Sequence, residues 1–172
     1  MIVERAEAAD LDEIGGLLAE GAAWMHAKGT PAWTYAEIAP AALAARIAEG
    51  AFICARSEGT IVGVCMLSRV DLEFWPDDPL GEAGYLHRLC VRRSFAGARV
   101  TPLLVDWCVR AARAWRCKAL RLDCHPNLRG LYERLGFTYV DTRTIQTRGA
   151  RTIVVDRLQI SLRAPSLDLA LS

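Results

Sequence analysis

The chain has 172 residues, of which 52% are hydrophobic and 24% charged, and its formal net charge is +1. This length suits one α/β domain with a single core better than two domains. No apolar run approaches the ~20 residues that span a bilayer, and the first residues lack the basic-then-apolar pattern of an export signal. We therefore expect an ordinary globular protein of the cytoplasm without membrane association.

The cysteines point to the same compartment. None of them forms a CxxC pair, and most lie among apolar neighbours, which favours buried, reduced thiols over disulfides or a metal site. The three histidines are scattered, so we expect no metal cofactor. The six cysteines are Cys54, Cys65, Cys90, Cys108, Cys117 and Cys124.

Charge is distributed unevenly along the chain. Residues 1–86 carry 14 acidic and 5 basic side chains, whereas residues 87–172 carry 6 acidic and 16 basic ones. Either the two halves complement each other in the fold, or the basic half binds a polyanionic ligand while the acidic half receives a cationic one. The basic residues are spread over several predicted elements without an aromatic-interleaved run, so nucleic acid is not the expected partner.

The N-terminal half predicts two helices and three strands. In chain order these are a strand over 2–6, a helix from Leu11 that ends by Gly29, a helix over 41–49, and strands over 52–56 and 61–68. Asp10 can cap the first helix, whose leucine and isoleucine residues recur at helical spacing. Pro40 opens the second helix. A hairpin turn separates the two later strands, and an acidic loop over 71–84 follows them.

The C-terminal half predicts two more helices and four more strands. In chain order these are a strand over 85–91, a helix over 103–115, a strand over 119–124, a helix over 128–135, and strands over 138–146 and 153–161. The early strands follow one another, whereas the later ones alternate with helices. We therefore expect an α/β fold with a mixed sheet of about seven strands covered by about four helices. We assign residues 1–161 to one domain and 162–172 to a C-terminal tail.

The most informative segment begins at the predicted strand Tyr85–Val91, which leads through Arg92–Pro102 into a helix. A strand, a tight loop and a helix start together form an anion site, because unpaired amides at a helix N-terminus point toward the ligand. Further on, the sequence Tyr-Glu-Arg-Leu-Gly-Phe at 132–137 stands at the end of a predicted short helix.

This succession resembles the coenzyme half of the GNAT superfamily of N-acetyltransferases, in which a loop Arg/Gln-x-x-Gly-x-Gly/Ala precedes one helix and Tyr-x-x-x-Gly-Phe ends another. The resemblance is weak over 1–161 and strong over 85–140, and the segments Phe74–Asp78 and Arg121–Cys124 are similar to a bacterial subgroup. It implies a GNAT-type sheet, acetyl-CoA as cosubstrate, and transfer of an acetyl group to a primary amine of a small molecule or peptide. The implied chemistry is direct attack of the neutral amine on the thioester carbonyl.

The resemblance also assigns the coenzyme-binding residues. The strand backbone at Leu89, Cys90 and Val91 would lie beside the pantetheine arm, with a main-chain amide polarising the thioester carbonyl. The phosphates would lie at the loop formed by Ala96, Gly97, Ala98, Arg99, Val100 and Thr101.

This loop departs from the family pattern. Ala96 takes the usual Arg/Gln position, Arg99 and Thr101 take glycine or small-residue positions, and only Gly97 keeps its glycine. Glycine suits such a loop because phosphates approach the backbone closely and some torsions need positive φ, which costs another residue about 1–3 kcal/mol. Arg99 either obstructs the site or replaces lost amide contacts by pairing its guanidinium with phosphate.

Two residues are candidates for proton transfer. Tyr132 occupies the position of the general-acid tyrosine of the family, and the alternative is that its ring only packs beneath the helix. Strand alternation places His87 on one face with Leu89 and Val91, so His87 is the candidate base, directly or through water. A satisfied, partly buried histidine is the alternative.

Other candidates lie outside these motifs. Asn127 stands near the position of an asparagine that contacts the coenzyme arm in the family, although it lies closer to Tyr132 than usual, and a helix-capping role is the alternative. Either the acidic loop draws a cationic amine to the acceptor side, or it is only a solvated loop; its acidic residues are Asp71, Glu73, Asp77, Asp78 and Glu82. Trp24, Trp33 and Tyr35 either wall the acceptor pocket or pack.

Two functions are compatible with these features. One is an N-acetyltransferase, which Tyr132 and the basic half favour. The other is a catalytically silent GNAT-fold protein that binds a ligand or partner, which the altered loop favours. A homodimer stays open.

Overall fold

One mixed sheet organises the chain, which a computed structural model describes over residues 1–30, 33–147 and 151–162. In chain order the strands are β1 (Ile2–Arg5), β2 (Phe52–Ser57), β3 (Thr60–Ser68), β4 (Ala83–Val91), β5 (Ala119–Cys124), β6 (Thr138–Gln146) and β7 (Thr152–Ser161). The helices are α1 (Leu11–Ala27), α2 (Pro40–Ala48), α3 (Val100–Ala114) and α4 (Arg129–Arg134). The predicted α/β architecture, with its strand and helix order, is confirmed.

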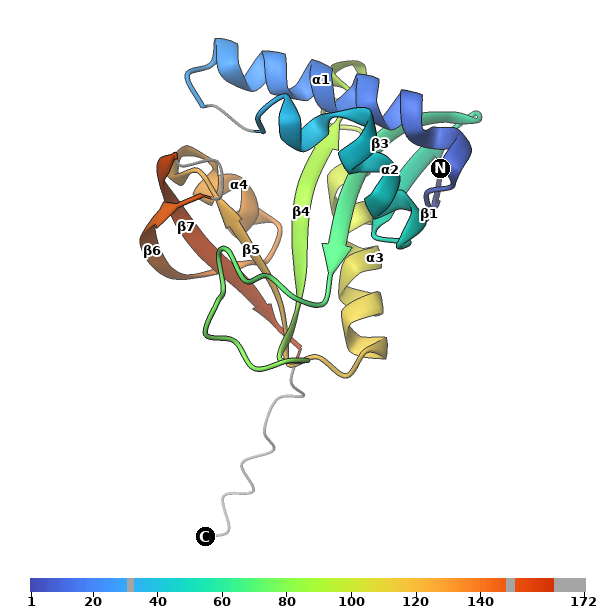
Figure 1. Cartoon of the computed structure of the whole chain (residues 1–172). Coiled ribbons are helices and arrows are strands. Elements are labelled where there is room, and N and C mark those ends of the chain that lie inside the picture. The colour runs from blue at the N-terminus through green and yellow to red at the C-terminus, as the bar shows by residue number, and fades with distance from the viewer. Residues whose placement is uncertain (31–32, 148–150, 163–172) are drawn as a thin grey trace, which may run out of the picture.

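The strand order in the sheet is β1-β2-β3-β4-β5-β7-β6. All neighbouring strands pair antiparallel except β4 and β5, which are parallel and pair only from Ala83 to Tyr85 on β4 and from Ala119 to Arg121 on β5. Beyond Tyr85 the two strands separate, as the gap between the β4 and β5 ribbons in Figure 1 shows. Both strands therefore carry backbone groups without a strand partner along the inner edges of this opening.

Helices cover both faces of the sheet (Figure 1). Alternation along β2 assigns the faces: Phe52 and Cys54 pack in the cluster formed with α1 and α2, whereas Ile53 and Ala55 pack in the cluster formed with α3. No helix in the described ranges is both long enough and apolar enough to cross a bilayer.

Two contacts, one before α1 and one after β7, differ from what the sequence predicted. Asp10 does not cap α1 with its side chain; its Oδ2 accepts from the Glu7 amide at 2.8 Å and lies 2.7 Å from Arg56 Nη2, which ties the turn before α1 to β2. The predicted C-terminal tail begins at Leu162, whose amide still donates to the Lys118 carbonyl at 2.9 Å. Residues 163–172 lie outside the described part of the chain.

A β-bulge interrupts β4 next to the opening. Val64 pairs with Cys90 but Met66 pairs with His87, so β4 has one residue more than β3 here, and Arg88 at the bulge has a φ of 50°. The extra residue reverses the alternation, so the prediction that His87 shares a face with Leu89 and Val91 is wrong. Leu89 and Val91 pack on the α3 side, whereas His87 lies opposite Met66, which packs on the α1–α2 side together with Cys90.

The close approach of α3 to the sheet depends on Gly63. The helix begins at Val100 rather than at the predicted Leu103, because Val100 is buried against β3 and β4. A Cβ on Gly63 would lie 2.6 Å from Val100 Cγ1 and 3.3 Å from Val91 Cγ2. The glycine therefore fixes where the first turn of α3, and the loop before it, lie relative to β4.

We expect Gly63→Ala to destabilise the protein by about 1–3 kcal/mol, because the added methyl overfills this contact. Urea denaturation would measure the effect. Gly16→Ala in α1 is the matched control, because a Cβ there meets nothing within 4 Å, and it should be neutral or stabilising by up to about 1 kcal/mol. A Gly63→Ala variant as stable as the parent would show that this contact does not set the position of α3.

Candidate active site

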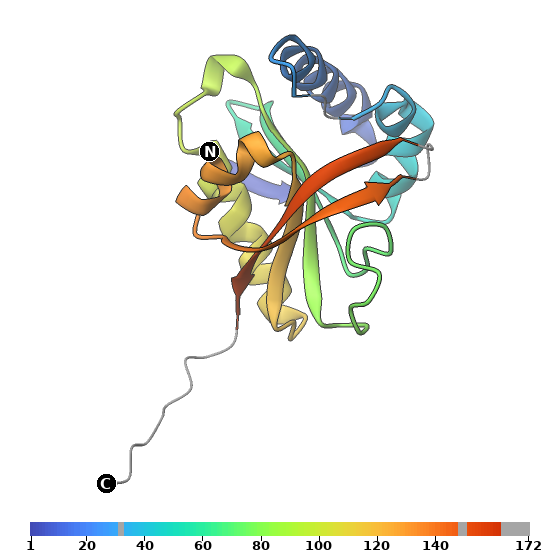
Figure 2. The same ribbon diagram turned by 90° about the vertical axis from the view of Figure 1, so that its left-hand side faces the viewer.

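A cavity of about 760 Å³ opens where β4 and β5 separate. Residues 86–89 of β4 form one wall, and Asp123 and Cys124 of β5 form another. Residues of α1, α2 and the segment between them, of β3 and the loop after it, of α4 and the turn before it, and of β7 also line the cavity. The β6–β7 hairpin reaches toward the α1–α2 side of the molecule (Figure 2), where Arg151 Nη2 lies 3.5 Å from Glu37 Oε2.

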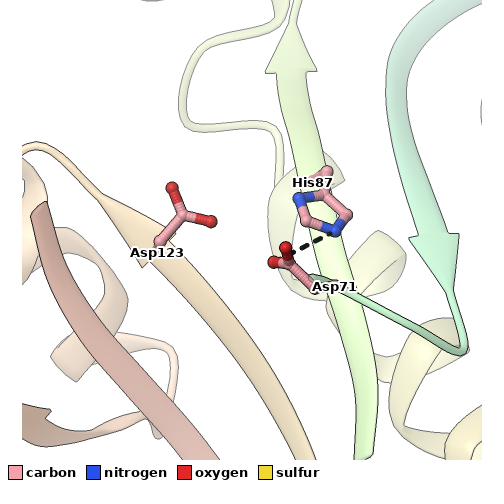
Figure 3. Close-up of side chains that lie close together, drawn as sticks. All are labelled: Asp71, His87 and Asp123. Carbon is pink, nitrogen blue, oxygen red and sulfur yellow. Dashed lines mark ion pairs between the residues drawn. The ribbon is translucent and has the colours of Figure 1, made fainter. Parts of the chain in front are cut away.

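Three titratable side chains meet in this cavity (Figure 3). His87 comes from β4, Asp123 from β5 across the opening, and Asp71 from the loop after β3. Asp71 Oδ2 lies 3.8 Å from His87 Nε2. One carboxylate oxygen from each aspartate and one imidazole nitrogen of His87 all lie within 4.8 Å of one another. Such a spacing suits a small cation or a protonated amine held between them.

Asp71 is held rigidly in this cluster. Its Oδ1 accepts from the amides of Glu73 at 3.1 Å and Phe74 at 3.0 Å. The residue is only 8% exposed, and its Oδ2 has no hydrogen-bond partner among the described residues. A buried carboxylate oxygen without a donor is costly.

The surroundings shift the pKa of the other two groups. Burial raises the pKa of Asp123 to about 8, and the negative charges of Asp71 and Glu73 add to the increase. Burial lowers the pKa of His87; Asp71 opposes this effect, whereas Arg88 and Arg46 reinforce it. Near neutral pH, His87 is therefore neutral and able to accept a proton, and Asp123 is largely protonated.

Tyr132 lines the same cavity from α4. Its ring packs edge-on against Phe137 with centroids 5.9 Å apart, so the packing role considered for this residue is real. Burial raises the pKa of Tyr132 well above its ordinary value, and the nearby Cys124 and Asp123 act in the same direction. The hydroxyl thus stays protonated near neutral pH.

The predicted phosphate loop does not line the cavity; it follows the end of β4, of which residues 86–89 do line it. Gly97 has a φ of 85° and Arg99 a φ of 60°, so Arg99 adopts the left-handed conformation that suits glycine at this position. The amides of Val100 and Thr101 belong to the first turn of α3, which has no intrahelical acceptor for them. The loop therefore offers backbone donors at a helix start together with the exposed Arg99 side chain.

Some predicted residues are not brought to the cavity. Asn127 is exposed and does not line it. The capping alternative for Asn127 is also wrong, because Leu128 stands at the N-cap of α4 without a side-chain cap. Asn127 lies in the 3-10 turn Pro126–Leu128 before α4, where His125 Nδ1 accepts from its amide at 3.2 Å. The thiol of Cys90 points away from the α3 side and packs against α1, with Sγ 3.7 Å from the Leu17 carbonyl.

Only some of the aromatic and acidic candidates line the cavity. Trp33 lines the cavity, whereas Trp24 lies under Arg93 with the guanidinium carbon 4.2 Å from the ring centroid, and Tyr35 is 84% exposed. Asp71 and Glu73 line the cavity. Asp78 instead accepts from Tyr85 Oη at 2.6 Å, outside it.

Sequence reasoning missed Asp123 and Arg88 as cavity residues. Asp123 stood only in a segment that resembled the family, and its exposure to the cavity depends on the separation of β4 from β5. Arg88 lines the cavity because of the bulge. A charged residue next to His87 in an otherwise apolar strand was the one signal available for it.

We expect Asp123→Asn to change how stability depends on pH. The carboxyl of Asp123 has a pKa of about 8 when folded and about 3.9 when unfolded, so its stabilising effect is full below pH 4 and lost as pH rises toward 8. The variant lacks this loss, so its stability relative to the parent should rise by more than about 1 kcal/mol between pH 5 and 8. Urea denaturation at both pH values measures this, with the exposed Asp106→Asn as control; parallel pH curves for Asp123→Asn and the parent would disprove the shift.

Comparison with known proteins agrees with this geometry. Residues 20–137 match the family model described as the acetyltransferase (GNAT) family. YesJ of Bacillus subtilis (strain 168), named an uncharacterized N-acetyltransferase, is 28% identical over 140 residues, which cover 76% of this chain and 78% of YesJ.

Solved structures show the same fold. YncA from Salmonella typhimurium, solved with its cofactor acetyl-CoA, has a TM-score of 0.70 at 15% identity and covers 95% of each chain. A GNAT-family acetyltransferase from Listeria monocytogenes 4b F2365 has a TM-score of 0.68 at 20% identity, covering 93% of this chain and 94% of its own. With the family model matching more than half of its length, the chain belongs to the acetyltransferase (GNAT) family.

Proposed function

We propose that this protein transfers an acetyl group from acetyl-CoA to a primary amine of a small molecule or peptide by direct attack. The observation that carries the proposal is the opening between β4 and β5, which contains a proton-accepting cluster and the half-buried phenol of Tyr132 in one cavity. The six cysteines are free thiols, which supports the proposed location in the cytoplasm.

The separated strands suit an extended coenzyme arm. A ligand with amides along its length can bind the backbone groups of an unpaired strand edge, as peptides do in strand addition. The bulge at Arg88 leaves one residue of β4 out of its ladder with β3. A main-chain amide in this region of β4, close to Leu89, is our candidate for polarising the thioester carbonyl.

The phosphates of the coenzyme would lie at the Gly97–Thr101 loop. Helix-start amides and positive charge together stabilise phosphate. Arg92 is already paired with Glu13, at 3.3 Å, and Arg93 lies over Trp24. Arg99, which is exposed at the N-cap of α3, is therefore the cation that we assign to phosphate pairing.

Proton transfer would use the two sides of the cavity. The amine nitrogen attacks the thioester carbonyl carbon, a C–N bond forms and the C–S bond breaks. His87, neutral and next to Asp71, takes the surplus proton from the amine directly or through water. Tyr132 gives its proton to the departing thiolate, so the products are an N-acetylated amine and free coenzyme A.

Titration with acetyl-CoA tests the first requirement, and Arg99 variants show what the altered loop does. If Arg99 pairs with phosphate, Arg99→Ala should weaken binding by about 1.5–3 kcal/mol, and added salt should weaken the parent more than the variant. If Arg99 obstructs the loop, Arg99→Gly should instead bind more tightly than the parent, because glycine restores room and accepts φ of 60° without strain.

Calorimetry resolves these outcomes. A parent protein with no affinity at millimolar acetyl-CoA would overturn the proposal and favour the alternative, a catalytically silent GNAT-fold protein. Tighter binding by both Arg99 variants would disprove phosphate pairing.

Tyr132→Phe tests the proposed acid. The variant keeps the ring contact with Phe137 but loses the hydroxyl, so affinity for acetyl-CoA should hold while turnover falls roughly 10²–10⁴-fold. Thiol release with an accepted amine measures turnover. Unchanged turnover would leave Tyr132 with its packing role alone.

A further inference from the structure

The cavity has a second charged pole besides the Asp71–His87–Asp123 cluster. Arg88 lines it from the β4 bulge, directly beside His87 in the chain. Its Nη2 donates to the Glu37 carbonyl at 2.9 Å, and its Nη1 lies 3.4 Å from Met66 Sδ. These contacts fix the guanidinium but do not neutralise it.

Arg88 differs in this respect from the other two arginines of the cavity. Arg46 Nη1 lies 2.8 Å from Glu49 Oε2, and Arg151 Nη2 lies 3.5 Å from Glu37 Oε2. Within the described ranges, Arg88 has no carboxylate at ion-pair distance, and its buried Nε has no hydrogen-bond partner. A half-buried guanidinium without a carboxylate partner is costly, and its planar fork matches a carboxylate.

Each of the two charged regions, at Asp71 and at Arg88, contains one polar atom without a hydrogen-bond partner in the described part of the chain. Of the buried side-chain atoms that lack a hydrogen-bond partner in the described residues, one is the acceptor Asp71 Oδ2 and another is the donor Arg88 Nε, and both residues line this cavity. His87, Arg88 and Asp71 line one cavity, so a ligand in that cavity has both poles beside it.

Building on the proposed function, we infer that the acceptor is a free amino acid, whose ammonium group binds Asp71 beside His87 and whose carboxylate pairs with Arg88. The ammonium loses one proton through the adjacent His87 to solvent before the neutral amine attacks, and the carboxylate fixes its orientation. A peptide N-terminus lacks this neighbouring carboxylate and satisfies only one pole.

The rest of the lining contains charged residues such as Glu37, Arg46 and Arg151, and its apolar part indicates the kind of side chain that the ligand carries. Met25, Trp33, Met66 and Phe74 line the same cavity, and large apolar and aromatic walls favour an apolar ligand group. We therefore assign the site to amino acids with large apolar side chains, such as leucine or phenylalanine.

The test compares each amino acid with the amine that lacks only its carboxylate. Leucine is matched with 3-methylbutylamine and phenylalanine with 2-phenylethylamine, and calorimetry measures their affinity for the protein loaded with coenzyme A. We expect each amino acid to bind at least about 10-fold more tightly than its amine, the factor that a hydrogen-bonded charge contributes. An amine that binds as tightly as its amino acid, or a panel in which nothing binds, would overturn the inference.

Variants of Arg88 test whether this residue causes the preference for an amino acid over its amine. Arg88→Gln should abolish it, and Arg88→Lys should retain it in part, because lysine keeps the charge but not the fork. Arg110→Gln on the exposed side of α3, where Arg110 pairs only with Asp106, should leave it intact. A preference that survives Arg88→Gln would place the carboxylate elsewhere and contradict the assignment. The comparison on the parent protein does not depend on these variants folding.

The outcomes also separate this inference from the proposed function. If coenzyme A binds and some amine is acetylated without regard to a carboxylate, the proposed function stands and the amino-acid assignment falls. If coenzyme A does not bind, the proposed function falls, and the same panel titrated into coenzyme-free protein still shows whether the two poles recognise an amino acid.

Discussion

The short pairing between β4 and β5 is the constraint on which the site depends. Their ladder ends at Tyr85 and Arg121, although both strands continue, and a sheet does not leave backbone groups unpaired inside a protein without a cost. The opening persists because the sheet is held on either side of it, by the β3–β4 ladder and by the β5–β7 ladder. A ligand that fills the opening replaces the missing pairing, which is why we place the coenzyme arm there.

The same opening between β4 and β5 brings titratable and charged side chains together in the cavity. His87 and Asp123 face each other across it because their strands no longer pair, and the loop after β3 adds Asp71. The bulge in β4 adds Arg88, held at a φ of 50°. Such a conformation costs a residue other than glycine about 1–3 kcal/mol, and strained residues and unpartnered buried charges concentrate at functional sites. The protein thus holds two charges that it does not neutralise itself, and a zwitterionic ligand would neutralise both.

The sequence predicted the order and type of the elements because their signals are local. Apolar periodicity, Pro40 at a helix start and the hairpin before Thr60 each depend on neighbouring residues. It also predicted that Arg99 stands where glycine is usual, and its φ of 60° agrees. The side-chain faces of β4 were predicted wrongly, because a bulge depends on the partner strand and leaves no simple pattern in its own sequence. Asp123 was missed for a similar reason, since only the separation of two strands distant in sequence exposes it to the cavity.

The proposed chemistry depends above all on where the coenzyme binds. A crystal structure with bound coenzyme A tests it: we predict the pantetheine arm between β4 and β5, the pyrophosphate at Gly97–Thr101, and the sulfur within the cavity lined by His87 and Tyr132. A coenzyme bound outside this opening, with β4 and β5 unchanged and the cavity filled only by solvent, would contradict it.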